Sequence, residues 1–329
     1  MHSMMDVGSS QAMSTAKNKY RHWCRTIPAM PVFSKDWWLD AACGEENWDV
    51  ILVEDRGEVV ASFPYFLKRR SLFSILSMPP LTQKLGPFIV YPEGVPEAAR
   101  LSLDKRVMTE IIDSLPPHDR FQVHFDHAIT NWLPFYWRGF SQTTAYTYVV
   151  PDICDPDAVL ATFENSKKGD IKKAARLVDV EFDLTAEAFY EHRKLALLKQ
   201  GQTVSYSFET FKRIFQAAYA AASGKSIAAR GKDGSIHAAL FIVWSEEAAY
   251  YLVTSVDPDH RKSGALSLLT LEAIRHASAY TKRFDFEGSM IEGVEASYRK
   301  FGTVQTPYMF ITRTSSRLLR MREAALSAL

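Results

Sequence analysis

The sequence has almost no excess charge of either sign. It contains 39 Lys and Arg against 38 Asp and Glu, which gives a formal net charge of +1 over 329 residues. A protein dedicated to nucleic-acid binding normally carries a strong basic excess, so this balance argues against that class and against a DNA partner. It leaves open contact with the end of a tRNA or with a sugar nucleotide, because a few local Arg and Lys side chains suffice.

The sequence also has little of what metal sites, disulfides and membrane spans require. Its three cysteines, Cys24, Cys43 and Cys154, are far apart, and neither they nor the nine histidines show metal-ligand spacing. The first 20 residues lack the apolar core of a signal peptide. No apolar run approaches the roughly 20 residues of a membrane-spanning helix. We therefore expect reduced cysteines, no metal, a disordered segment over residues 1–20, a cytoplasmic location and no integral membrane association.

Motifs for some common enzyme classes are missing as well. The sequence contains no GxSxG and no P-loop, which removes support for a serine hydrolase or an NTPase. What it does contain is alternating strand and helix patterns. Turn residues at 55–58 and 232–234 predict two β-hairpins, and apolar periodicity predicts helices, among them residues 96–115, 157–177 and 263–279. The predicted fold class is therefore α/β, with α+β character.

The two halves of the chain resemble each other. The first hairpin matches the second at an offset that places Glu54 on Gly231, and a second offset places Glu110 on Glu272. That second offset also superposes Tyr136 on Tyr298, so it holds across two helices and into the strand that follows. A duplicated α/β unit with a boundary near residue 155 is the simplest account. The alternative is chance agreement between common strand and helix patterns.

The segment after a predicted strand at 248–254 has the composition of an anion-binding loop. A glycine-containing loop leads into a helix N-terminus, where backbone N–H groups and the helix dipole attract a pyrophosphate. The pattern V-x-P-x-x-R-x-x-G-[small]-x-x-L resembles the acyl-CoA loop of GNAT acetyltransferases. The resemblance implies donor contacts from Val256, Arg261, Lys262, Ser263, Gly264 and Ala265. Leu266 departs from the small residue expected there, and an ordinary strand-to-helix loop is the structural alternative.

A second motif lies at residues 296–302, A-S-Y-R-K-F-G. It resembles the A-x-x-Y-x-K-x-G run that follows the donor helix in GNAT enzymes, which implies that Tyr298 protonates the departing thiolate. A phenol with a pKa of about 10 carries the proton needed for this role at neutral pH. The alternative is a packed aromatic side chain. The counterpart of the donor loop in the first half, residues 94–100, lacks paired basic residues, so we expect donor binding in the second half alone.

A third motif, residues 284–292, resembles the C-terminal block of Fem-like proteins, which add amino acids to peptidoglycan precursors or acyl groups to sugars. Attack by an amine needs a group that takes its proton. Glu287 is the predicted base and Asp285 the second choice. Alternatively, these carboxylates cap the next helix or pair with Arg299. Some Fem-type members have a lysine where Tyr298 stands, a departure that argues against aminoacyl-tRNA use by this chain.

Acceptor contacts are predicted from a basic stretch and from a loop in the first half. Residues 165–174 resemble a segment near the acceptor in Fem-like chains, which implies that Lys167 and Lys173 bind an anionic group of the acceptor. Arg299 and Gln83 are further substrate-binding candidates. A solvated helix face is the alternative for the lysines.

Together these motifs predict a member of the Fem-like, tandem-GNAT group of acyltransferases. The expected domains are residues 21–154, on the acceptor side, and residues 155–329, with the donor site. Each is a mixed sheet flanked by helices, and the two share a cleft. The expected reaction moves an acyl group from acyl-CoA, acetyl-CoA first, to an amine of a sugar-nucleotide, polysaccharide or peptide-linked precursor of the cell envelope, without a covalent enzyme intermediate. Aminoacyl-tRNA-dependent transfer to a peptidoglycan precursor and non-catalytic ligand binding are the alternatives.

Overall fold

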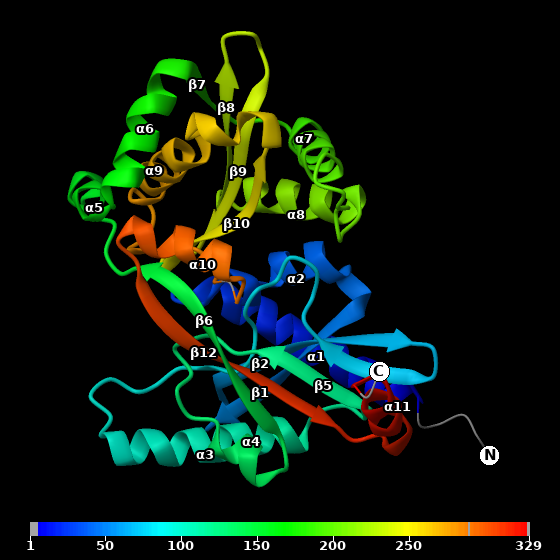
Figure 1. The fold of residues 1–329 in the computed structure, drawn as a ribbon. Helices are drawn as coiled ribbons and strands as arrows, with labels where there is room; N and C mark the ends of the chain where they lie inside the picture. Colours follow the sequence, from blue (N-terminus) through cyan, green and yellow to red (C-terminus); the bar gives the residue numbers. More distant parts are fainter. Residues whose placement is uncertain (1–5, 289, 328–329) are drawn as a thin grey trace. The chain divides into compact units, whose positions relative to one another are not determined.

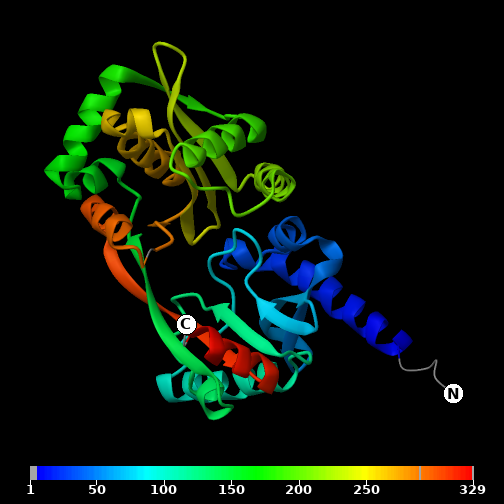
Figure 2. The ribbon, with the colours of Figure 1, turned by 45° about the vertical axis from the view of Figure 1, so that its right-hand side comes forward.

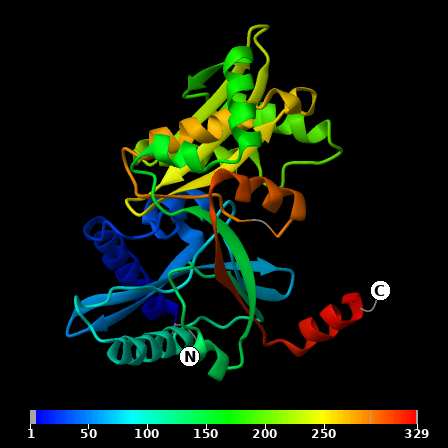
Figure 3. The same ribbon diagram turned by 60° about the vertical axis from the view of Figure 1, so that its left-hand side comes forward.

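The computed structural model describes residues 6–288 and 290–327 of the chain. Its contacts divide the chain into two compact units. Unit 1 contains residues 1–145 and 307–329, and unit 2 contains residues 146–306. Two strands, β6 (Ser141–Val150) and β12 (Val304–Thr314), each begin in one unit and end in the other, and they lie side by side (Figure 3).

Unit 1 is an α/β unit with a mixed sheet. Its elements are α1 (Asp6–Thr26), η1 (Val32–Ser34), α2 (Asp36–Cys43), η2 (Glu45–Asn47), β1 (Trp48–Asp55), β2 (Glu58–Arg70), β3 (Phe73–Ser77), β4 (Phe88–Ile89), α3 (Glu97–Asp113), β5 (Arg120–His124), α4 (Leu133–Trp137), most of β12, and α11 (Arg317–Ser327). The strand order is β1-β2-β3-β5-β12, with β4 paired to β2. Helix α1, dark blue in Figure 2, packs along β1.

The β1–β2 hairpin of unit 1 forms at the turn that the sequence predicts. Arg56 and Gly57 both have positive φ, 52° and 88°, the geometry of a two-residue hairpin turn that matches the twist of its strands. The strands then pair from Asp55↔Glu58 to Trp48↔Phe66. Consecutive residues of both strands are buried, and Phe63 of β2 stacks on Phe121 of β5 with ring centroids 6.1 Å apart.

Unit 2 contains the elements that build the candidate site. They are α5 (Pro156–Thr162), α6 (Asn165–Leu177), β7 (Val178–Phe182), α7 (Ala186–Leu198), α8 (Phe208–Ala220), β8 (Gly224–Gly231), β9 (Ile236–Trp244), β10 (Ala248–Val256), η3 (Pro258–Ser263), α9 (Ala265–Ala277), β11 (Arg283–Asp285), α10 (Glu292–Tyr298) and η4 (Arg299–Phe301). The strand order is β6-β11-β10-β9-β8-β7, with β10 parallel to β11 and the other neighbouring pairs antiparallel.

Helices cover both faces of the unit 2 sheet (Figure 1). Leu240 and Ile242 of β9 belong to one buried cluster with α9. Phe241, between them, contacts Phe189 of α7 and Phe215 of α8 instead, with ring centroids 6.4 and 4.7 Å apart. Because successive strand residues point to opposite faces, a continuous apolar run such as β9 is what a sheet buried on both faces requires.

The internal repeat predicted from the sequence has a counterpart in the order of elements. A hairpin, a strand, a helix, a strand, a short helix and a strand follow one another as β1-β2, β3, α3, β5, α4, β6, and again as β8-β9, β10, α9, β11, α10, β12. The last strand of each series pairs with the fourth strand of the other series: β6 with β11, and β12 with β5. The predicted mixed α/β fold class is confirmed.

Some local predictions differ from the structure. The segment expected to be disordered, residues 1–20, contributes residues 6–20 to α1, while residues 1–5 lie outside the described part of the chain. Tyr20 of this helix is fully buried and donates a hydrogen bond to the Ser34 carbonyl. Burial of such aromatic side chains stabilises the helix although its sequence is polar on average. The helix expected over 157–177 is two helices, α5 and α6.

The compact units divide the chain differently from the predicted domains. The prediction places residues 307–329 in the second domain, whereas their contacts place them in unit 1. The physical reason is pairing, since Phe310 to Thr314 of β12 pair with residues 120–124 of β5. Residues 146–154 join unit 2 because Val149 and Val150 of β6 pair with β11. The boundary at 154/155 stays a prediction about the duplicated sequence.

Candidate active site

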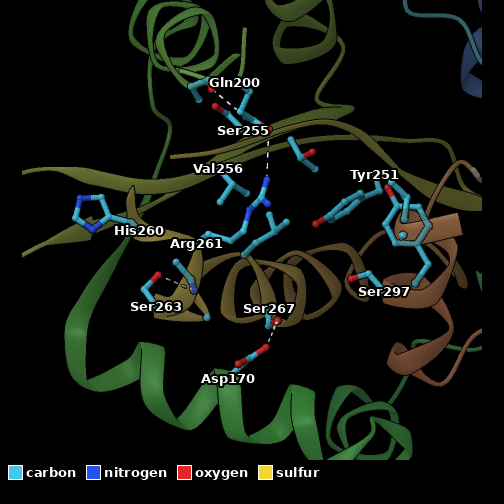
Figure 4. A pocket seen from close by; sticks show the side chains of 18 of the residues that line it. Asp170, Gln200, Tyr251, Ser255, Val256, His260, Arg261, Ser263, Ser267 and Ser297 are labelled. Atoms are coloured by element: carbon cyan, nitrogen blue, oxygen red, sulfur yellow. Dashed lines mark hydrogen bonds between the residues drawn. The ribbon is translucent and has the colours of Figure 1, made fainter. Parts of the chain in front are cut away.

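Unit 2 contains a cavity of about 630 Å³. Its walls come from α6, α7, the end of β10, η3, the first turn of α9, and α10 with η4 (Figure 4). The predicted donor residues Val256, Arg261, Ser263, Gly264 and Ala265 all line it. The structure therefore gathers most of the predicted donor loop around one space large enough for a ligand of the size of a small molecule.

The conformation of the donor loop depends on Gly264. Its φ of +78° is a left-handed conformation that side chains other than glycine rarely adopt. A Cβ atom there would lie 2.4 Å from the backbone carbonyl oxygen of Asp170, so α6 packs directly against this glycine. On its other side the loop is held by Ser263, whose Oγ accepts a hydrogen bond from the Ala265 N–H at 3.2 Å. The first turn of α9 is thereby presented to the cavity.

Charged groups of both signs line the cavity. Arg261, Arg193 and Lys167 contribute positive charge, and Asp170 contributes a carboxylate beside the first turn of α9. Arg261 Nη2 donates to Gln200 Oε1 at 3.3 Å, and Ser267 Oγ donates to Asp170 Oδ2 at 3.5 Å. The cations and the helix N-terminus suit a phosphate group, whereas the Asp170 carboxylate works against one.

Lys167 is the member of the basic stretch that reaches the cavity. Its Nζ donates to Ser297 Oγ at 3.0 Å and lies 4.5 Å from the centre of the Phe301 ring. Burial lowers the pKa of this ammonium below its ordinary value, because the charged form loses hydration. Its partner in the prediction, Lys173, donates instead to the Lys262 carbonyl at 2.5 Å, which joins α6 to the end of η3.

Tyr298 stands in the wall of the cavity at the end of α10. Its ring lies 5.0 Å from that of Phe286 and 6.0 Å from that of Tyr251, centre to centre. Burial, and then the negative charge of Glu287, raise the pKa of the Tyr298 hydroxyl above its ordinary value. The hydroxyl therefore keeps its proton throughout the neutral pH range, as a proton donor must.

The two predicted carboxylates are buried next to the cavity and are not among the described residues that line it. Asp285 accepts hydrogen bonds from the Thr147 hydroxyl and, at 2.8 Å, from the Glu287 N–H. It thus holds the turn in which Glu287 and Gly288 adopt positive φ values of 63° and 66°. The role of Glu287 as a base stays a prediction, and the contacts of Asp285 are those of a structural group.

The remaining predicted site residues lie elsewhere. Lys262 belongs to η3 and is exposed, and it is not among the described residues that line the cavity. The Arg299 side chain is 60% exposed, and its Nε lies 3.9 Å from Glu295 Oε1. Gln83 belongs to unit 1, in the segment between β3 and β4. The donor-binding role of Lys262 and the substrate-binding roles of Arg299 and Gln83 stay predictions.

The structure adds cavity residues that the sequence did not indicate. Arg193 from α7 donates to the Thr254 carbonyl. Ser255 on β10 lines the cavity and lies 2.7 Å from His192, measured from Oγ to Nδ1. His192 and Arg193 belong to a helix without a recognisable motif, so only their spatial position reveals them. Ser255 directly precedes Val256, the first residue of the predicted donor loop. This neighbourhood in the sequence is the signal that could have indicated it.

Within the described residues, no group of three or more His, Cys, Asp or Glu side chains is placed to hold a metal ion. No helix in that same part of the chain has the length and apolar character required to cross a membrane.

The sequence of this region matches a known family. Residues 163–295, which contain α6 through α9 and most of α10, match the model of the acetyltransferase (GNAT) domain. This segment includes nearly the whole cavity wall, among it the donor loop and the first turn of α9. A comparison with curated proteins found no match.

Solved structures share the fold of the whole chain at low sequence identity. The structure of FemX has a TM-score of 0.65 and 13% identity, with coverage of 89% of this chain and 95% of FemX. The C-terminal domain of a putative lysylphosphatidylglycerol synthetase from Agrobacterium fabrum gives a TM-score of 0.53, 13% identity, and coverage of 94% and 95%. The structure of L-PGS from Bacillus licheniformis has a TM-score of 0.50 and 11% identity, with coverage of 84% of this chain and 87% of L-PGS.

These comparisons confirm the predicted recognition and enzyme class. The chain carries a GNAT domain in its second half, it is an acyltransferase, and its fold is the Fem-like one that FemX displays. The comparisons support acyl or aminoacyl transfer in general.

Proposed function

We propose that this acyltransferase is an N-acyltransferase that moves an acyl group from acyl-CoA, most simply acetyl-CoA, to the amine of a sugar-nucleotide, polysaccharide or peptide-linked precursor. One observation carries the proposal: the cavity of unit 2 ends at the first turn of α9, with Gly264 in the left-handed conformation and Arg261 beside it. A helix N-terminus flanked by an arginine is suited to the diphosphate of a thioester donor.

The residues present fit such a donor. Ser263, Gly264 and Ala265 line the cavity at the start of α9, and Arg261 adds a guanidinium that donates to the neutral side chain of Gln200. The cavity then continues toward Val256, Tyr251 and Tyr298, an apolar and aromatic stretch that suits the remainder of a thioester. CoA is here a substrate that supplies the activated acyl group.

The chemistry that follows requires two proton movements. A neutral acceptor amine attacks the thioester carbonyl carbon, the C–N bond forms, and the C–S bond breaks as the amine loses a proton. The departing thiolate takes a proton, and Tyr298 is the group in the cavity wall that holds one throughout the neutral range. Positioning of the two substrates supplies much of the remaining rate enhancement. No covalent enzyme intermediate is needed.

The acceptor side of the cavity is marked by Lys167 and Ser297. Lys167 is held between the Ser297 hydroxyl and the Phe301 ring, which orients its ammonium toward the space. An acceptor that carries a phosphate or carboxylate near its amine would find a partner there. This supports an anionic precursor such as a sugar-nucleotide over a neutral amine.

Aminoacyl transfer from a charged tRNA is the second candidate, and one observation favours it. The Asp170 carboxylate lies beside the first turn of α9, where it repels a diphosphate, and Leu266 replaces the small residue expected in that turn. A tRNA 3′ end presents no diphosphate to this position. The fold shared with FemX and with lysylphosphatidylglycerol synthetases accords with this candidate. Non-catalytic ligand binding is the third candidate.

Substitution of Asp170 separates the first two candidates. If acyl-CoA is the donor, Asp170→Asn removes a like charge next to the diphosphate and increases acetyl-CoA affinity about threefold, an effect that weakens in high salt. Calorimetry at two salt concentrations measures it, with Asp179→Asn on the exposed part of β7 as the matched control. Transfer of radiolabel from an aminoacyl-tRNA, with no thiol release from acetyl-CoA, supports the second candidate instead. Ligand binding without transfer from either donor supports the third.

A further inference from the structure

A serine and a histidine form a hydrogen-bonded pair in the wall of the cavity. Ser255 lies at the end of β10 and lines the cavity (Figure 4). Its Oγ is 2.7 Å from Nδ1 of His192, which α7 contributes from the neighbouring layer. The other ring nitrogen, Nε2, is 2.9 Å from the Ile236 carbonyl oxygen. The predicted bases Glu287 and Asp285 are not among the described residues that line this cavity.

The contacts of the imidazole determine where its protons lie. A carbonyl oxygen can only accept a hydrogen bond, so Nε2 of His192 carries a proton and donates it to Ile236. In a neutral ring Nδ1 is then an acceptor, and the Ser255 hydroxyl donates to it. The hydrogen bond therefore leads from Ser255, a residue of the cavity wall, to the ring of His192 behind it.

The surroundings keep this histidine neutral at physiological pH. Burial lowers the pKa of His192, and Lys199 and His260 act in the same direction. The hydrogen bond to the Ile236 carbonyl and the charge of Asp257 oppose this change. Asp257 is itself bound by Lys199 Nζ, at 2.7 and 2.9 Å to its two oxygens. The Asp257 carboxylate therefore already has a lysine as its counter-ion and does not require a protonated His192.

We propose that Ser255 is a catalytic residue that accepts the proton of the attacking amine while it passes its own hydroxyl proton to His192. The inference rests on the proposed N-acyl transfer. In the step, the C–N bond to the acceptor forms and the C–S bond of the thioester breaks. One amine proton moves to Ser255 Oγ, and the Ser255 proton moves to Nδ1 of His192. After product release the imidazolium returns its proton to solvent, and Tyr298, which protonated the thiolate, regains one from solvent. His192 acts through Ser255 and is a positioning residue.

The pair is tested with two variants and a matched control in the full-length enzyme. The variants are Ser255→Ala and His192→Gln. The control is His118→Gln in unit 1, a histidine whose Nδ1 bonds a backbone carbonyl at 2.8 Å and whose pKa burial also lowers. Acetyl-CoA is the donor, and hydroxylamine is the amine probe, because it is small and uncharged at pH 7.5. Thiol release measures kcat, and calorimetry measures acetyl-CoA affinity.

The proposal predicts that each variant lowers kcat at least about 100-fold and leaves acetyl-CoA affinity within about twofold. The control keeps the activity of the unmodified enzyme. After correction for the protonated fraction of hydroxylamine, the rate of the unmodified enzyme falls on acidification, and the fall lies below the ordinary histidine pKa of about 6.5 because burial lowers the pKa of His192. That decrease is absent from the residual rate of His192→Gln. Nitrogen NMR at pH 7.5 shows a neutral His192 ring protonated at Nε2.

Different results overturn different parts of the account. Variants that retain more than a third of the activity, or a His192 ring protonated at Nδ1, remove the relay and leave the proposed N-acyl transfer intact. An acetyl adduct on Ser255 in intact-protein mass spectra replaces the relay with a covalent route. An unmodified enzyme that neither binds acetyl-CoA nor releases thiol from it removes the proposed function, and the relay with it.

Discussion

Tyr298 combines two properties at the scale of the single residue. It lines the cavity, and burial together with the charge of Glu287 raises its pKa. A raised pKa makes the phenol a weaker acid, but it also keeps the group protonated in every free enzyme molecule at neutral pH. A thiolate leaving group is basic enough to take such a proton in concert with C–S cleavage.

Replacement of Tyr298 by Phe therefore lowers kcat about 100-fold and leaves acetyl-CoA affinity almost unchanged, since the ring and its aromatic contacts remain. The matched control is Tyr280→Phe, because Tyr280 is 52% exposed and stacks on Trp244. Steady-state kinetics with acetyl-CoA and a series of donors with more acidic thiols measures the effect. A defect that is equal for all leaving groups contradicts the proton-donor role.

The residues of the site differ in how much the sequence revealed of them. Gly264, Arg261 and Tyr298 belong to motifs with fixed spacing, and the structure places all three at the cavity. His192 was not predicted, because its function depends on a carbonyl and a hydroxyl from two strands that are distant in sequence. Glu287 and Asp285 were chosen from a segment that resembles the Fem-like C-terminal block and from a strand alternation that ends at Gly288, and their catalytic roles stay predictions.

At the scale of elements, the contact between α6 and the start of α9 determines the shape of the site. The Asp170 backbone of α6 fills the space where a side chain on Gly264 would lie. Lys173 of the same helix donates to the Lys262 carbonyl at the end of η3. The basic helix that the sequence suggested as an acceptor surface thus also supports the donor loop.

Gly264→Ala tests this packing. The substitution places a methyl group 2.4 Å from a carbonyl oxygen and also requires a positive φ, so the loss of stability should exceed about 3 kcal/mol. Gly234→Ala is the matched control, since Gly234 has a φ of +84° but no atom within 4 Å of its Cβ position. It should cost about 1 kcal/mol. Urea unfolding measures both, and equal losses would show that α6 does not press on the loop.

The last strand of each half pairs with a strand of the other half, and this explains why the order of elements was easier to predict than the extent of the compact units. Hairpin, helix and strand patterns are local, and the offset that links Tyr136 with Tyr298 predicted their order. The pairing of β12 with β5 and of β6 with β11 joins residues far apart in sequence. The helix α1 was not predicted because the segment is polar on average. A few buried aromatic side chains, such as Tyr20 and Trp23, hold it in place, and the average composition does not reveal them.

At the scale of the whole molecule, partly or fully buried histidines are present in both units. Burial is the largest cause that lowers the pKa of five of them, namely His118, His124, His192, His237 and His276. Each binds its proton more weakly in the folded chain than in the unfolded one. The stability of both units therefore depends on pH in the same direction.

The free energy of unfolding should be greatest above the ordinary histidine pKa of about 6.5 and should decrease as pH falls from there toward 5. In that range the unfolded chain binds more protons than the folded one, so acid favours unfolding. We expect a loss of about 1–3 kcal/mol between pH 7.5 and 5.0. Urea midpoints across this range measure it. A constant or rising midpoint on acidification is inconsistent with neutral buried histidines.

The central claim, that the cavity of unit 2 binds an acyl-CoA donor at the first turn of α9, is tested most directly by calorimetric titration of the protein with acetyl-CoA. The account predicts that acetyl-CoA binds in the micromolar range and that Arg261→Ala weakens this binding at least about tenfold. The control is Arg176→Ala, at an exposed position of α6. Absence of binding to acetyl-CoA and to free CoA, or binding that Arg261→Ala leaves unchanged, contradicts the claim.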